Sequence, residues 1–107
     1  MQSQLRNGLT AEKTIYVDNQ SYTADPATLK QIEPSLDWGG KLKVVVGDAD
    51  AVSGAVVCLS EASPSGTVYA IADVASGSDA GTYYAKTVCP PTIDDTTAAA
   101  LGSTTGW

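Results

Sequence analysis

The spacing of apolar residues changes at Lys41, and this change limits the folds open to the chain. Before that point apolar residues recur at helical intervals, over about 4–17 and again over 26–33. After it, short apolar runs separated by brief loops predict strands. These strands are expected at 41–46, 55–59, 67–72 and 82–88. Because consecutive strands with short connections favour an antiparallel meander, we predict an α+β fold. An N-terminal helix should pack on a roughly four-stranded antiparallel sheet, with a short second helix in the connection.

One face of the first helix carries the side chains that should dock on the sheet, because they form an apolar stripe at helical spacing. A charged residue, at position 12 or position 13, falls on the same face. The residues expected to make this helix–sheet packing are Leu5, Leu9, Ile15 and Tyr16.

The first turn of this helix lacks the usual signals of a natural start. Ser3 could cap it, but Arg6 follows three residues later, and a cation is unfavourable at the positive end of the helix dipole. No carboxylate precedes Glu12. We expect this segment to be the remainder of a longer helix, whose missing part anchored and assembled the protein. The alternative is an ordinary helix with a frayed end.

The length of 107 residues suits one domain with a modest core. It divides into the first helix (1–18), the connection to the sheet (19–40), the sheet (41–89) and a C-terminal tail (90–107). The net charge of -6 and the pI near 4.2 predict a surface that repels phosphates and anionic lipid. No nucleic acid is therefore expected as a partner.

Two short helices have recognisable ends. Asp25 can cap the second helix, Pro26 suits its first position, and Pro34 stops it, so that Leu29 and Ile32 should dock on the core. In the tail, the acidic pair at 94–95 precedes a Thr/Ala-rich run that ends at a glycine, which predicts a further short helix over about 94–102.

Cys58 and Cys89 are the only cysteines, and the chain contains neither histidine nor a CxxC pair. Two thiols alone make a poor zinc site. A disulfide between them is the favoured interpretation and would place the protein outside the cytoplasm. Two buried free thiols are the alternative.

The sequence offers little for catalysis. Without histidine, Ser-His-Asp and Cys-His catalysis are excluded. Asp48 and Asp50 lie in a Gly-led turn and could give oxygen ligands to calcium, although a solvated turn is the favoured interpretation. We therefore predict a protein that is not an enzyme and has no cofactor.

Several segments of the first two thirds carry a family resemblance. Leu5-Arg6-Asn7 and Ala11-Glu12 lead into YVDNQSYT at 16–23, and VCLS at 57–60 is followed by SGTVY at 65–69. Together they resemble the globular domain of a bacterial type IV pilin over roughly 4–69. The rest of the chain is similar to that family only in architecture.

This resemblance implies a structural subunit of a pilus on the cell surface. Family members have a long N-terminal helix whose hydrophobic first half sits in the cytoplasmic membrane and later packs in the filament core. The implied partners are other pilin subunits, the membrane, the prepilin peptidase that removes a leader, and the assembly machinery. The loop over about 17–40 and the region bounded by Cys58 and Cys89 would decorate the filament.

The chain departs from the family pattern in two respects, and other functions stay open. The hydrophobic segment with its acidic residue is not in this sequence, and Cys58 lies early in the sheet. The first alternative is a pseudopilin of a type II secretion system, which a calcium site would favour. The second is a secreted or adhesive binding module that uses a surface aromatic residue such as Trp38 or Trp107.

Overall fold

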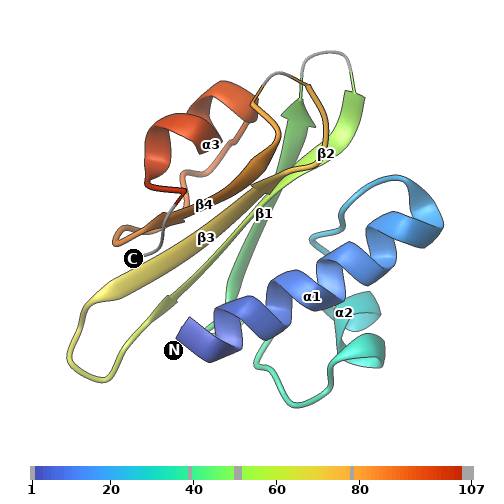
Figure 1. The fold of residues 1–107 in the computed structure, drawn as a ribbon. Coiled ribbons are helices and arrows are strands. Elements are labelled where there is room, and N and C mark those ends of the chain that lie inside the picture. The colour runs from blue at the N-terminus through green and yellow to red at the C-terminus, as the bar shows by residue number, and fades with distance from the viewer. Residues whose placement is uncertain (1, 39, 50–51, 78, 105–107) are drawn as a thin grey trace.

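The computed structural model describes residues 2–38, 40–49, 52–77 and 79–104, with the side chains of positions 2 and 3 left aside. Two helices cover one face of a four-stranded sheet and a third helix covers the other (Figure 1). The predicted α+β fold, with its N-terminal helix on an antiparallel sheet, is confirmed. The elements in chain order are α1 (Gln2–Asn19), α2 (Pro26–Ile32), β1 (Lys43–Ala49), β2 (Val52–Ala62), β3 (Val68–Val74), β4 (Gly81–Ala85) and α3 (Asp95–Leu101).

The sheet is an antiparallel meander in the order β1-β2-β3-β4. Its second strand is central, and every residue from Gly54 to Glu61 is buried. This agrees with the nearly continuous apolar run of β2, since a strand that is covered on both faces needs apolar side chains on both. Odd-numbered positions such as Val57 and Leu59 face α1, whereas Cys58 faces α3.

The strands differ in length from the prediction. β1 continues to Ala49 and β2 to Ala62, through stretches predicted to be turns, while β4 ends at Ala85 instead of continuing to position 88. After β4 the chain leaves the edge of the sheet and crosses its second face. It reaches β1, where Asp94 forms a bridge with Asp48. The pairing of β4 is completed by Ser103, whose backbone exchanges two hydrogen bonds of 2.7 and 2.8 Å with Tyr84.

The short helices begin as their sequences predict. The Asp25 carboxylate accepts a hydrogen bond of 3.2 Å from Ala27 N, and the Asp94 carboxylate accepts one of 2.7 Å from Thr97 N. Both satisfy a backbone donor that the first turn leaves without a partner.

The prediction that both Leu29 and Ile32 dock on the core is half wrong. Leu29 is fully buried, but Ile32 is 40% exposed. Ile32 is the last residue of α2, and it lines a hollow beside the outer surface of α1 together with Asn7 and Thr14. The helix therefore places only one of its two apolar residues against the sheet.

Two separate apolar clusters fill the molecule. We call the side of the sheet that carries α1 and α2 the first face, and the side that carries α3 the second face. The first-face cluster contains most of the large side chains, among them Leu5, Leu29, Trp38, Leu59 and Ile71. The second-face cluster consists mainly of alanine, valine and the two cysteines.

Candidate functional site

The packing of α1 on the sheet is the first candidate site. The structure places Leu5, Leu9 and Ile15 in the first-face cluster, with exposed fractions of 0, 6 and 3%. Tyr16 is only partly buried and lies against the ring of Tyr22, with 4.8 Å between the ring centroids. Three of the four expected side chains thus form the interface, and the fourth lies at its margin.

A glycine permits the close approach of helix and sheet. A Cβ atom added at Gly8 would lie 2.9 Å from the Leu59 side chain and 3.2 Å from the Trp38 ring. Glycine costs about 1 kcal/mol relative to alanine in a helix. Here the missing side chain makes room for the side chains of Leu59 and Trp38.

Glu12 is the charged member of this interface. Its side chain is fully buried, whereas that of Lys13 is 54% exposed, so the charged residue on the packing face is the glutamate. Glu12 Oε1 accepts a hydrogen bond of 3.0 Å from Thr23 N, and among the described residues Oε2 has no partner. Burial raises the pKa of Glu12 to about 7, although the bond from Thr23 lowers it in part.

A second buried carboxylate lies on β3. The Asp73 side chain accepts a hydrogen bond from the Tyr22 hydroxyl and one of 2.7 Å from Thr82 Oγ1. Lys13 Nζ lies 3.8 Å from the same carboxylate. Burial, together with the hydrogen bond to Asp73, raises the pKa of Tyr22, so its phenol keeps its proton and acts as the donor.

We call these five residues the buried polar network: Glu12, Tyr22, Thr23, Asp73 and Thr82. It joins α1, the connection after it, β3 and β4. Because the Glu12 side chain has no exposed surface, it cannot meet a substrate directly. The arrangement can hold the chain at 22–23 against the helix and the sheet. Sequence reasoning found only one hint of it, the acidic residue on the packing stripe.

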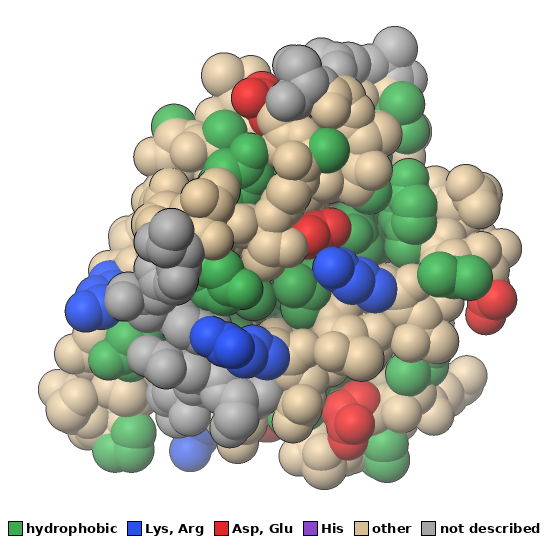
Figure 2. All heavy atoms as spheres, viewed as in Figure 1, with side chains coloured by type: hydrophobic (Ala, Val, Ile, Leu, Met, Phe, Trp, Pro, Cys, Tyr) green, Lys and Arg blue, Asp and Glu red, His purple; other side chains and the backbone are tan. Residues whose placement is uncertain are grey.

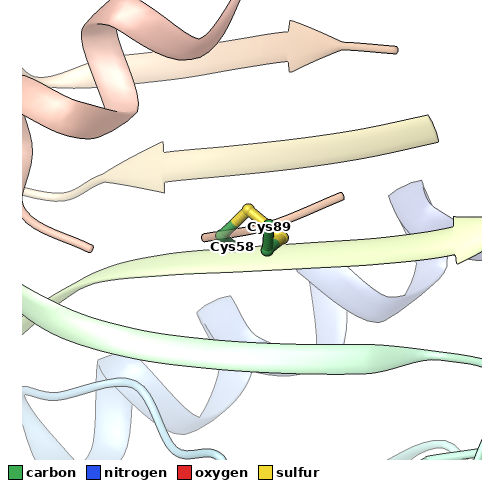
Figure 3. Close-up of a disulfide and its surroundings, with 2 residues drawn as sticks. All are labelled: Cys58 and Cys89. Carbon is green, nitrogen blue, oxygen red and sulfur yellow. A yellow bond between two sulfur atoms is a disulfide. The ribbon is translucent and has the colours of Figure 1, made fainter. Parts of the chain in front are cut away.

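The predicted disulfide between Cys58 and Cys89 is present (Figure 3). It joins β2 to the segment that crosses the second face, with 5.9 Å between the two Cα atoms. The α1 ribbon passes on the other side of the sheet. Such a bond is consistent with an extracytoplasmic location.

The structure describes only one carboxylate of the Asp48/Asp50 pair that was considered for calcium, so the pair is not tested. Asp48 Oδ1 accepts a hydrogen bond of 3.0 Å from Gly54 N, which explains its place in the hairpin, and Asp50 lies outside the described residues. Within the part of the chain that the structure describes, no three His, Cys, Asp or Glu residues are grouped to hold a metal ion. On the face shown in Figure 2, acidic and basic side chains are scattered and do not gather into a patch of one sign.

The expectation that Trp38 is a surface aromatic residue is wrong. Its ring is 3% exposed and belongs to the first-face cluster, and its Nε1 donates a hydrogen bond of 2.8 Å to Glu33 O. The apolar ring fills the space over Gly8, while its one polar atom is satisfied by the backbone. Trp107, the other candidate, lies outside the described residues.

Comparison with protein-family models, with curated proteins and with solved structures finds no match to this chain. None of the helices in the described ranges is long and apolar enough to cross a membrane. The fold class and the disulfide therefore rest on the sequence and the structure alone.

Proposed function

We propose that this protein is a non-catalytic structural subunit of an extracytoplasmic filament of the type IV pilin kind. The observation that carries the proposal is the packing of one amphipathic N-terminal helix along an antiparallel meander, with a disulfide in the following region. The same combination is implied by the resemblance of the sequence to that family.

The outer surfaces of α1 and α2 support a role in subunit contacts. A hollow of about 210 Å³ lies between them, lined by small polar side chains of α1 and by the exposed Ile32 of α2. Val17 is 74% exposed near the end of α1. Neighbouring copies could pack on this surface, while a preceding apolar helix would supply most of the free energy of association.

The genomic reading frame upstream of this sequence tests the proposal. We expect a leader that ends in glycine, followed by an apolar segment of about 20 residues with an early glutamate. A conventional signal peptide with an Ala-x-Ala cleavage site would overturn the filament proposal and favour a secreted binding module.

The related secretion pseudopilin would give the same upstream result, and calcium distinguishes it. Thermal unfolding of the protein is measured in calcium and again in a chelator. A pilin subunit without a calcium site should show the same midpoint in both, whereas a site that binds calcium raises the midpoint with concentration. Replacement of Asp48 by Asn should then remove such a rise.

A further inference from the structure

The outer edge of β1 is open over four residues, from Lys43 to Val46, because the backbone of Ile93 lies against Gly47. In the described parts of the chain, β1 pairs only with β2 along this stretch. The nearest bridges on the outer side are Trp38 with Leu42 before it and Asp48 with Asp94 after it. Alternate backbone N–H and C=O groups of an edge strand point away from the sheet. An open stretch of this length spans about 14 Å and can accept another strand.

A hollow of about 360 Å³ follows this edge on both faces of the sheet. Pro26, Leu29 and Trp38 form its wall on the first face, and Val88 and Cys89 form its wall on the second. Val88 is 58% exposed, which is unusual for a large apolar side chain in this protein. Successive side chains of a strand point to opposite faces, so a strand added to β1 would place one set of side chains against each wall.

Two lysines and two carboxylates lie at or beside this edge. Lys43 lines the hollow and two adjoining ones of about 490 and 150 Å³, both shared with Lys41. Neither ammonium group has a salt-bridge partner in the described ranges. Glu61, which is 6% exposed, is the acidic side chain in the adjoining wall. Asp37, whose Oδ2 accepts a hydrogen bond of 3.0 Å from Lys41 N, is a second acidic neighbour, so Lys43 is the cation on the strand itself that has no ion-pair partner in the described ranges.

A buried hydroxyl in the same hollow lacks a partner. Ser60 is paired with Lys43 across the two strands, is 1% exposed, and its Oγ makes no hydrogen bond with the described residues. A buried polar atom without a partner is costly, and a bound molecule with a polar group could satisfy it.

We propose that the outer edge of β1 binds an extended, mainly apolar peptide segment of a partner protein, with a carboxylate opposite Lys43, as a fifth strand of the sheet. The apolar walls on both faces suit alternating side chains of a strand. Lys43, which has no ion-pair partner in the described ranges, favours a carboxylate at the position opposite it on the added strand. This inference does not depend on the filament proposal.

The test uses a synthetic probe, the peptide acetyl-Asp-Val-Thr-Val-Thr-Val-amide, titrated into the isotope-labelled protein. Backbone amide NMR signals should shift along Lys43 to Val46, and those of Val88 should shift with them. A matched peptide with N-methyl groups on alternate residues should bind at least about tenfold more weakly, because it lacks the donors that a strand pair needs. Shifts confined to other surfaces, equal binding of both peptides, or no binding at millimolar concentration would each overturn the proposal.

Two variants of the protein test separately the charge of Lys43 and the apolar wall that contains Val88. Lys43→Glu should weaken binding of the acidic probe by about tenfold and leave a probe with Asn in place of Asp almost unaffected. Val88→Asp should abolish binding, while Val17→Asp, an exposed valine on α1, should leave it unchanged. Circular dichroism confirms that each variant is folded. If Lys43→Glu binds the acidic probe as tightly as the unaltered protein does, the edge does not select an acidic segment. If the probe displaces self-association of the protein, the edge binds a second copy, and the proposal is overturned.

Discussion

The two faces of the sheet are held by different means. The first face is covered by α1 and α2 through leucine, isoleucine and tryptophan side chains, whereas the second is covered by α3 and the crossing segment through alanine and valine. Large side chains bury more apolar surface, and buried surface contributes about 25 cal/mol per Å². The second face has less surface to bury, and it is the face that carries the disulfide.

The two faces of the sheet also differ in their buried polar groups. Both buried carboxylates of the polar network, Glu12 and Asp73, lie on the first face. A large apolar cluster can tolerate the cost of such groups, while their hydrogen bonds fix the position of the connecting chain. One face thus uses burial and a polar network, and the other uses small side chains and a covalent bond. Four changes test this difference, from the largest expected effect to the smallest.

Removal of the disulfide should have the largest effect. In the double variant Cys58→Ala and Cys89→Ala, the loop closed across 31 residues is lost. The free energy of unfolding should fall by about 3.5–4 kcal/mol, because the unfolded chain regains the entropy that the loop removed. Urea unfolding measures this change.

Amide exchange shows whether the effect belongs to the second face. Reduction of the unaltered protein should speed exchange in α3 and β4 more than in α1. Equal acceleration in α1 would contradict the separation of the two faces.

Truncation of a large first-face side chain should have the next largest effect. Leu5→Ala empties space in the cluster, since Leu5 is fully buried, and should cost about 3 kcal/mol by denaturant unfolding. Ile32→Ala is the matched control, because that side chain is 40% exposed, and should cost no more than about 0.5 kcal/mol. Similar losses in both variants would contradict the conclusion that burial of Leu5 stabilises the packing on the first face.

Glu12 should make the stability of the first face depend on pH. Its native pKa of about 7 lies above its ordinary value of 4.5, so the native state holds the proton more tightly than the unfolded state. The contribution of Glu12 to stability is then greatest below pH 4.5 and is lost as the pH rises through 7, by up to roughly 3 kcal/mol.

Urea unfolding at pH 5 and pH 9 measures this change, and the absence of histidine removes the usual competing titration. Glu12→Gln should flatten the profile, whereas Asp18→Asn, at an exposed position on α1, should preserve it. A profile of Glu12→Gln as steep as that of the unaltered protein would show that another group titrates.

Loss of one hydroxyl from the polar network should have the smallest effect. Tyr22→Phe removes the donor to Asp73 and should cost about 1.5–2 kcal/mol, since the carboxylate keeps Thr82 and Lys13 as partners. Tyr16→Phe is the control, because it retains the ring contact with Tyr22, and should change stability by less than about 0.5 kcal/mol. Thermal unfolding compares the two, and equal losses would mean that the hydroxyl of Tyr22 contributes nothing specific.

Much of the fold could be predicted because its signals are local. The capping aspartates and Pro26 set where short helices begin, and the alternation of apolar residues indicates the strands. The order of the strands followed from their short connections. The disulfide could be inferred because no other use for two cysteines was apparent, not because their spacing required it.

The candidate sites depended on contacts between distant segments, and there the predictions were weaker. Glu12 is bonded to Thr23, which lies 11 residues away along the chain. Asp73 is bonded to Tyr22, which lies 51 residues away. No local pattern indicates such a partner. Trp38 was considered as a surface aromatic residue of a binding module, yet Gly8 on α1 leaves the space that buries it.

By itself, the sequence determined which segments are helices and strands and which side of α1 is apolar, since these depend on the order of neighbouring residues. The tertiary structure alone decided which charged residue of α1 enters the core and that the segment after β4 crosses the second face. It also decided that, among the described residues, β1 pairs only with β2 from Lys43 to Val46. These outcomes depend on how separate elements share limited space, and hence on contacts between residues that are far apart in the chain.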